Sequence, residues 1–167
     1  SLARLNADGS FDHTFQLAFD FGYDGVYAIV LQSDGKIVVA GQGFNSGRHM
    51  VRLNSDGSVD TTFNVGTGFD GDVLVLLRQG DGKILAGGSF LSCNGTSVGR
   101  LARLNANGSL DAAFVAGSGF NDTVRTLALQ GDGKVIAGGN FGSYNGTSRN
   151  RIARLDGTTA ALDLGFR

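Results

Sequence analysis

The sequence predicts an all-β fold, a β-propeller built from three four-stranded blades of about 50 residues each, and three observations support this prediction. The motif LNADGSFD recurs along the chain at a nearly constant spacing. An Asp-Gly-Lys tripeptide joins two apolar stretches of strand length in each of three repeats. None of these stretches has the 3.6-residue apolar period of an amphipathic helix.

The repeated motif defines the domain organisation. Its copies read LNADGSFD, LNSDGSVD, LNANGSLD and, in a degraded form, LDGTTAALD. Their first residues are 48, 51 and 51 positions apart, at Leu5, Leu53, Leu104 and Leu155. We therefore expect a single repeat array over 1–167, with a surplus half-repeat at 1–15 and blades at 16–63, 64–114 and 115–167.

Each blade begins with a predicted β-hairpin. The first strands end in glutamine and lie at Val26–Gln32, Val73–Gln79 and Val124–Gln130. An Asp-Gly-Lys turn follows each of them, and Asp-Gly between apolar strands favours a primed turn in which both central residues have positive φ. Because these strands are apolar on both faces, each hairpin is expected to lie between two other sheets.

A third strand and a short fourth segment complete each repeat. The third strands read HMVRL, LARL and IARL, and the fourth segments end in Phe15, Phe63, Phe114 and Phe166. We expect these phenylalanines, together with Phe69 of GTGF and Phe120 of GSGF, to pack between blades. The pairs Gly87-Gly88 and Gly138-Gly139 predict β-bulges or a close approach of two backbones.

Composition restricts the function. Hydrophobic residues make up 41% of the chain and charged residues 17%, which is typical of a globular protein. A net charge of −1 disfavours binding to nucleic acid, and no apolar run is long enough to insert in a membrane. The single cysteine, Cys93, leaves the redox compartment open. We expect no cofactor, no metal site and no signal peptide in this chain.

The repeats do not add up to a closed ring. There are three Asp-Gly-Lys hairpins but four copies of the half that follows, and known propellers close with about four to eight blades. We expect the open ends to be covered by a second copy, two chains forming a six-bladed homodimeric ring of about 35 kDa, twice the chain mass of 17.3 kDa. The surplus half would pair with the last blade of the neighbour. A longer array and a self-closed three-bladed ring remain alternatives.

Two motifs have an ordinary structural interpretation. The NxDGSxD element is similar to part of a calcium loop, but Arg4, Arg52 or Arg103 occupies the position of the first ligand. A turn with Asx hydrogen bonds and Arg4–Asp12-type pairs is favoured. Asn94-Gly-Thr and Asn145-Gly-Thr match the N-glycosylation pattern, but Asn-Gly is also the preferred turn dipeptide, and the turn is favoured.

The long connections of the second and third repeats are the candidate binding loops. They run from Leu91 to Arg100 and from Gly142 to Arg151, whereas the first repeat has a short connection. An aromatic ring beside amide and guanidinium donors suits a sugar or a carboxylate. The candidate ligand-binding residues are Tyr144, Asn145, Arg149, Arg151, Asn94 and Arg100. No residue is assigned a catalytic role. A set of carboxylates could ring the mouth of a channel, but solvated turns are favoured: Asp20, Asp24, Asp70, Asp72 and Asp122.

The combined pattern resembles a family of bacterial β-propeller repeats of uncharacterised function, the delta-sixty type repeat. The resemblance spans essentially the whole chain. Its residues include Gln79, Asp81–Lys83, Gly87-Gly88, Phe90, Asn94-Gly95, Arg103–Asn105 and Gly108–Asp111. It implies a propeller, and a location in secreted or cell-surface bacterial proteins. It implies no catalytic residues.

Three functions are compatible with this sequence. The first is a non-catalytic binding or adhesion module whose ligand is a glycan or protein at one loop face. The second is a purely structural repeat that scaffolds other domains. The third, a glycoside-acting enzyme, would need convergent carboxylates in a pocket, and the spacing of the carboxylates does not require one.

Overall fold

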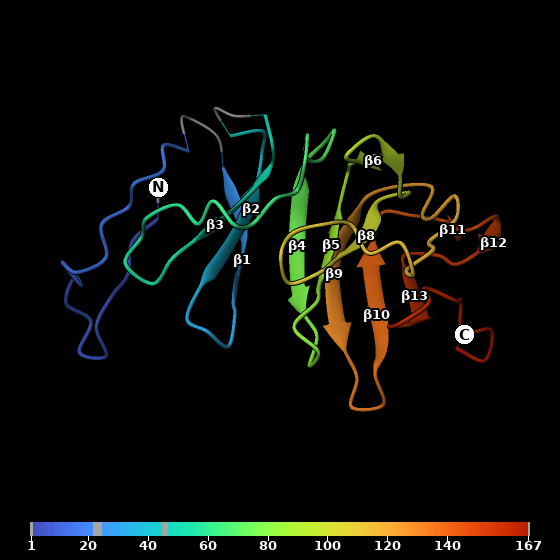
Figure 1. Ribbon diagram of the computed structural model, residues 1–167. Coiled ribbons are helices and arrows are strands. Elements are labelled where there is room, and N and C mark those ends of the chain that lie inside the picture. Colours follow the sequence, from blue (N-terminus) through green and yellow to red (C-terminus); the bar gives the residue numbers. More distant parts are fainter. Residues whose placement is uncertain (1, 22–24, 45–46, 167) are drawn as a thin grey trace.

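The computed structural model describes residues 2–21, 25–44 and 47–166, which form three antiparallel three-stranded sheets side by side (Figure 1). The sheets contain β1 (Val26–Leu31), β2 (Ile37–Gly41) and β3 (Met50–Leu53); β4 (Val73–Arg78), β5 (Ile84–Gly88) and β8 (Leu101–Leu104); β9 (Val124–Leu129), β10 (Lys134–Gly139) and β13 (Ile152–Asp156). In each sheet the second hairpin strand lies between the other two. The described part of the chain contains no helix, and therefore none that could cross a bilayer.

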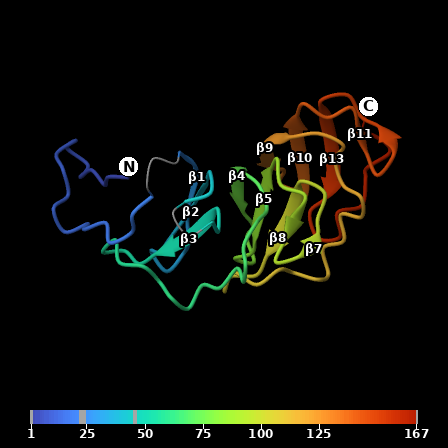
Figure 2. The same cartoon turned by 90° about the horizontal axis from the view of Figure 1, so that it is seen from above.

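The three sheets stack as successive blades. β1 contacts β4, and β4 contacts β9, so the first strand of each hairpin lies on the inner side of the arc. Seen from above, the remaining strands extend outward from this side (Figure 2). The predicted all-β propeller architecture is confirmed. We call the three sheets blade 1, blade 2 and blade 3.

The Asp-Gly-Lys hairpins form as predicted, but their turn type differs. In blade 2 the Gly82 N–H donates to the Gln79 carbonyl at 3.1 Å, and the Gln79 N–H donates to the Lys83 carbonyl at 2.9 Å. Gly82 has a φ of +84°, whereas Asp81 has no positive φ. This is a type I turn followed by one left-handed glycine, so the prediction of a primed turn is wrong. Asp81 acts through its side chain, because its Oδ1 accepts a hydrogen bond from the Lys83 N–H at 3.1 Å.

The paired glycines mark β-bulges, as predicted. The β4–β5 register shifts between Val73 and Val75, which face Gly88 and Gly87. A Cβ on Gly88 would lie 2.0 Å from the Asp72 carbonyl oxygen, so only glycine fits there. The β9–β10 register shifts at the equivalent Gly-Gly pair of blade 3.

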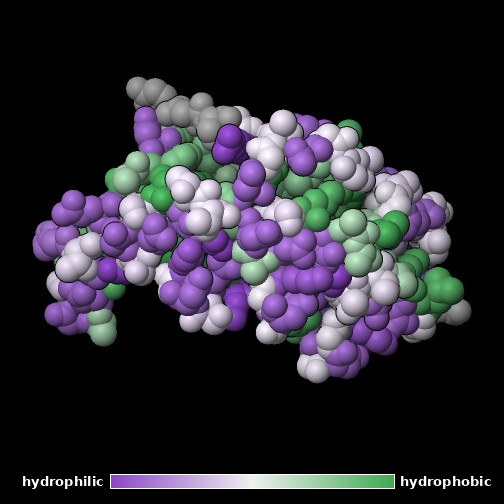
Figure 3. All heavy atoms as spheres, in the orientation of Figure 1, coloured by the Kyte–Doolittle hydropathy of each residue, from purple (hydrophilic) through white to green (hydrophobic). Residues whose placement is uncertain are grey.

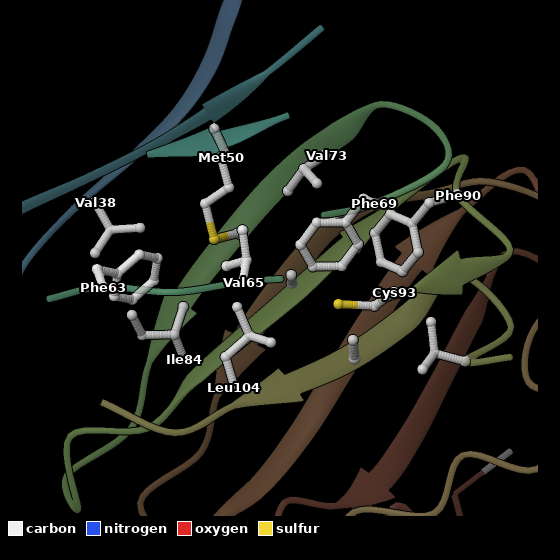
Figure 4. Close-up of a cluster of buried hydrophobic side chains, with 14 residues drawn as sticks. Val38, Met50, Phe63, Val65, Phe69, Val73, Ile84, Phe90, Cys93 and Leu104 are labelled. Atoms are coloured by element: carbon white, nitrogen blue, oxygen red, sulfur yellow. The ribbon is translucent and has the colours of Figure 1, made fainter. Parts of the chain in front are cut away.

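The core consists of layers between blades. The segment that leaves blade 1 places Phe63, Val65 and Phe69 between blade 1 and blade 2 (Figure 4). Met50 packs on this layer from blade 1 and Leu104 from blade 2. An equivalent layer, which contains Phe114, Ala116 and Phe120, separates blade 2 from blade 3. The predicted packing of phenylalanines between blades is therefore confirmed for both junctions.

Two short hairpins extend the outer ends of blades 2 and 3. They contain β6 (Ser92–Cys93) with β7 (Thr96–Ser97), and β11 (Ser143–Tyr144) with β12 (Thr147–Ser148). The fourth segment of each repeat pairs with the third strand through a single bridge, such as Leu104↔Leu110, and not through a ladder. Other contacts must therefore hold this segment in place.

An arginine supplies those contacts at each repeat. Arg52 Nε donates to Asp60 Oδ2 at 2.7 Å, and its guanidinium lies 4.7 Å from the centre of the Phe63 ring. Arg52 Nη1 also donates to the Ala106 carbonyl of the next repeat at 2.6 Å. We call each set of arginine, aspartate and phenylalanine an arginine node; the four nodes are Arg4–Asp12–Phe15, Arg52–Asp60–Phe63, Arg103–Asp111–Phe114 and Arg154–Asp163–Phe166.

A lysine from the hairpin strengthens the later nodes. Lys36 Nζ lies 2.6 Å from Asp60 Oδ2. Burial alone would raise the pKa of Asp60, but hydrogen bonds from Lys36 and Thr62 hold it well below its usual range. The predicted Arg–Asp pairs of the NxDGSxD motif are thus confirmed, and they join three parts of the chain.

Candidate functional site

The two long connections fold into hairpins with the tightest turns in the molecule. Asn94 and Gly95 have φ values of +49° and +73°, and Asn145 and Gly146 have +47° and +74°. Two consecutive positive φ values define a type I′ turn, for which Asn-Gly is the preferred pair. The turn interpretation of Asn-Gly is therefore confirmed. The tips of both hairpins are exposed.

The asparagine side chains of these turns hold the adjacent glycine-rich loops. Asn94 Oδ1 accepts a hydrogen bond from the Thr67 N–H at 3.2 Å. Asn145 Oδ1 accepts hydrogen bonds from the Gly119 N–H at 2.9 Å and from Ser118 Oγ at 3.0 Å. Each amide oxygen is thus used to position the GTGF or GSGF segment of its own blade.

Tyr144 does not provide the aromatic binding face that the sequence led us to expect. Its ring is fully buried, 4.7 Å from the Phe120 ring centre, and its hydroxyl donates to the Ala160 carbonyl at 2.8 Å. Burial raises the pKa of Tyr144 to about 12. Cys93 occupies the same position in blade 2, where burial raises the pKa of its thiol to about 11. Both side chains belong to the core because the strand β6 or β11 turns them inward.

The candidate arginines differ in their surroundings. Arg100 Nη1 donates to the Phe120 carbonyl at 2.7 Å and so links blade 2 to blade 3. Arg149 Nη1 donates to the Ser148 carbonyl at 2.8 Å. Arg151 is exposed and forms no side-chain hydrogen bond to the described part of the chain. Arg100 and Arg151 have φ values of +68° and +67°, so they occupy equivalent places in the two blades.

The carboxylates near the same end hold the loops. Asp70 Oδ1 accepts hydrogen bonds from the N–H groups of Leu91 at 2.7 Å and Ser92 at 2.9 Å. In blade 3, Asn121 Oδ1 makes the corresponding bonds. Asp122 accepts from Thr123, and this hydrogen bond lowers its pKa. Asp24 lies outside the described residues. Within the described ranges, no three His, Cys, Asp or Glu side chains converge in a way that could hold a metal ion.

The sequence analysis missed a set of hydroxyl groups at the hairpin tips. The side chains of Thr96, Ser97, Thr147 and Ser148 are exposed and are not used in the hydrogen bonds that hold the hairpins. They follow Asn-Gly at the same distance in both blades, so adjacent blades present the same pair of hydroxyls. The repeated NGTS tetrapeptide was the signal that could have identified them.

The described part of the blade 1 connection contains no such hairpin, and blade 1 has a hollow at the corresponding edge. The hollow has a volume of about 330 Å³ and is lined by Arg48, Phe19, Asp60 and Asn64, among others. Its aspartate already belongs to the Arg52 node. An equivalent hollow of about 420 Å³ lies beside the long connection of blade 2, lined by Thr96, Ser97 and Phe114 among others, so the hollow is a feature of the repeat and not of blade 1 alone.

Comparison with known proteins agrees with this architecture. Two solved structures share the fold: the computationally designed Ika8 protein, with 15% identity, a TM-score of 0.54 and coverage of 83% of this chain and 35% of that one; and the extracellular domain of the putative hybrid two component system BT3049 from B. thetaiotaomicron, with 14% identity, a TM-score of 0.55 and coverage of 91% and 17%. The chain thus spans about a third or less of the length of these structures. No curated protein matches it.

A family model matches the repeated part of every blade. The matched residues are 1–15, 32–63, 79–114 and 130–166, which include all four arginine nodes and the strands that flank them. The unmatched residues are the first strands of the hairpins and the segments before them. The resemblance to uncharacterised propeller repeats is confirmed, and the chain belongs to the family described as domain of unknown function (DUF5122) beta-propeller.

Proposed function

We propose that this chain is a non-catalytic propeller module that acts by surface contact, through the end of blades 2 and 3 that carries the hairpins β6–β7 and β11–β12. The observation that carries the proposal is the repeated pair of exposed hydroxyls on neighbouring blades, Thr96 with Ser97 and Thr147 with Ser148. Repeat proteins commonly bind extended ligands by offering the same contact from successive repeats.

The ligand class follows from the chemistry of these tips. Hydroxyls on rigid hairpins can both donate and accept hydrogen bonds, as the hydroxyls of a sugar do. The tips carry no cluster of charge, although Arg149 follows Ser148 and donates to its carbonyl at 2.8 Å. We therefore favour a glycan, or an extended segment of a protein, over a charged small molecule.

A glycan array probed with the full chain tests this proposal. Combined replacement of Thr96, Ser97, Thr147 and Ser148 by alanine should reduce binding at least tenfold, because it removes every repeated hydroxyl while leaving the turns intact. A matched control replaces Ser33 and Thr61 by alanine. Both hydroxyl residues are exposed, and neither lies in the hairpins β6–β7 and β11–β12. Equal binding by both variants would refute this choice of surface.

A structural scaffold is the second candidate. It is favoured by the internal use of four predicted ligand residues, Asn94, Asn145, Arg100 and Tyr144, all of which hold parts of the molecule together. An array without any binding, together with no binding to extracellular proteins in a pull-down, would favour this candidate. Release of reducing sugars from any bound glycan would instead favour a glycoside-acting enzyme.

We extend the proposal to an extracellular or cell-surface location. The similar fold of the extracellular domain from B. thetaiotaomicron supports it only as an example of where such propellers act. Labelling of intact cells with an antibody against this chain would test it, and labelling only after lysis would contradict it.

A further inference from the structure

The outward face of blade 3 is exposed, whereas the equivalent faces of blades 1 and 2 are covered by the next blade. Met50 in blade 1 and Leu101 in blade 2 occupy equivalent places and are 2% and 1% exposed. Ile152, their counterpart in blade 3, is 47% exposed. Beside it, Ile136 is half-buried, whereas its counterpart Leu85 is fully buried against the next blade.

At the opposite end of the array, the chain's own N-terminal segment covers only part of the matching face, through Phe15, Leu17 and Phe21. Ile29 on the first strand of blade 1 is 48% exposed, whereas its counterpart Leu76 packs against the preceding blade. Leu5, in the surplus half-repeat, is 57% exposed, whereas Leu53 is fully buried. The two ends therefore expose the two complementary sides of one blade-to-blade junction.

The hydrogen-bond donors at the open face of blade 3 also indicate that this face fits another blade. At the internal junctions, Arg103 Nη1 donates to the Gly157 carbonyl of the next repeat at 2.8 Å, and Arg100 donates to the Phe120 carbonyl. Arg154 and Arg151 are their counterparts in blade 3. Within the described residues, Arg154 donates to Asp163 and Gln130 of its own repeat, and the Arg151 side chain donates no hydrogen bond.

We propose that a second copy of this chain docks its blade 1 on the open face of blade 3, head to tail. By repeat equivalence, Arg154 of the first copy then donates to the Ser55 carbonyl of the second, and Arg151 donates to the Phe21 carbonyl. Ile152 and Ile136 are covered by the layer that Leu17 and Phe21 form in the second copy. Two such contacts unite six sheets, within the range in which propellers close.

The surplus half-repeat must move when the copies dock. In the single chain, Arg4 Nη1 already donates to the Ser55 carbonyl, which is the acceptor that Arg154 of the neighbour needs. β13 is the edge strand of its sheet, and the chain's own fourth segment lies against its outer edge through the bridge Leu155↔Leu162, where the surplus half of a neighbour was expected to pair. Leu2–Phe15 is the weaker competitor, because its bridge, Leu5↔Phe11, lies within the segment itself and the Phe11 side chain is 67% exposed. It forms a polar projection at the left of Figure 3. Docking therefore displaces Leu2–Phe15 of the second copy.

Two exposed positions allow a test that distinguishes the two sides of the junction. Light scattering should give about 35 kDa for the full chain, twice 17.3 kDa. Ile152→Asp and Ile29→Asp should each weaken this association at least tenfold, or about 1.4 kcal/mol. An equal mixture of the two variants should recover a dimer, because each retains the side that the other lacks. The control is Leu91→Asp, an exposed apolar position outside both faces (52% exposed).

Three outcomes would overturn the proposal. A mass of 17.3 kDa for the full chain at every concentration would refute self-association. Failure of the mixed variants to dimerise would refute the head-to-tail arrangement, and open-ended polymers would refute closure at two copies. Arg4→Ala provides a second test in the intact chain. It releases the Ser55 carbonyl, and we expect it to strengthen association, whereas unchanged or weaker association would contradict displacement of the surplus half. None of these results depends on ligand binding.

Discussion

The arginine nodes of Arg103 and Arg4 have the same residue types and nearly the same geometry, but they have very different surroundings. Arg103 is 2% exposed, binds Asp111, stacks on Phe114 and donates to the Gly157 carbonyl. The Arg4 side chain is 36% exposed, although it binds Asp12 at 2.8 Å and stacks on Phe15 in the same way.

The difference comes from the hairpin that precedes the node. Blade 2 contributes Lys83, whose Nζ lies 2.7 Å from Asp111 Oδ2, and the strand β5, which pairs with the strand that carries Arg103. The described part of the surplus half-repeat has no such hairpin. A motif of similar sequence is therefore a core element in one place and a surface element in another, and its contribution to the free energy of unfolding depends on burial.

Replacing the arginine should give the largest contrast. Arg103→Ala leaves the buried Asp111 carboxylate with one partner fewer and removes one of the two side-chain hydrogen bonds to the Gly157 carbonyl, so we expect a loss of about 3–5 kcal/mol of unfolding free energy. Arg4→Ala removes an exposed pair and should cost about 1 kcal/mol or less. Urea denaturation of both variants measures the difference. Equal losses would mean that burial does not determine the value of the node.

Replacing the stacked ring should give an intermediate contrast. Phe114→Leu removes the cation–π contact with Arg103 and changes the packing of a ring that is only 9% exposed, for an expected cost of about 1–2 kcal/mol. Phe15→Leu, at a half-buried position, should cost less. Thermal unfolding of the two variants provides the comparison, and a larger effect at Phe15 would contradict it.

Removing the lysine should make the Arg103 node more like the Arg4 node. Lys83→Met retains most of the aliphatic stem but removes the charge beside Asp111, and the Lys83 side chain is 30% exposed. We therefore expect a cost of about 1 kcal/mol or less. Lys36→Met, at the corresponding place in blade 1, should behave alike. A loss as large as that of Arg103→Ala would show that the lysine is the principal partner.

The stabilisation that the node carboxylates provide should be present at neutral pH and should be lost on acidification. A hydrogen bond from Lys134 lowers the pKa of Asp163 from its ordinary 3.8 to about 2. The pKa values of Asp60 and Asp111 are also lowered. Since these carboxyls bind protons more readily in the unfolded chain, their stabilisation is complete above pH 3.8 and is lost as the pH falls toward 2. Denaturation curves between pH 5 and about 2 should show this decline. Asp111→Asn should show a smaller decline, and an unchanged one would exclude this node as a cause.

Much of the fold could be predicted because it is encoded within each repeat. The Asp-Gly-Lys tripeptides located the hairpins, and Gly87-Gly88 located the bulge, since these residues act on their own backbone. The turn type could not be predicted from Asp81-Gly82 alone, because one additional loop residue changes a primed turn into a type I turn with a bulge. The primed turns occur instead at Asn94-Gly95 and its counterpart in blade 3.

The candidate site was harder to predict because it depends on contacts between repeats. Tyr144 follows a polar loop in the sequence, but the alternation of a two-residue strand turns it toward Phe120 and Ala160. The roles of Asn94 and Asn145 also depend on glycine loops that lie more than twenty residues earlier. Only Thr96, Ser97 and their counterparts, whose hydroxyls make no hydrogen bond within the described part of the chain, could have been selected from the repeated tetrapeptide.

The arginines of the first three nodes donate to the turn of the following repeat, from Arg4 to Ser55, from Arg52 to Ala106 and from Arg103 to Gly157. The acceptor is always a backbone carbonyl, so the bond does not depend on which side chain the next unit carries there. Duplication or loss of one whole unit in the gene would therefore rejoin every such bond without any compensating mutation. These bonds are therefore compatible with growth of the protein by unequal recombination. Because each bond runs from one repeat to the next, every lengthened version would have the same direction along the array.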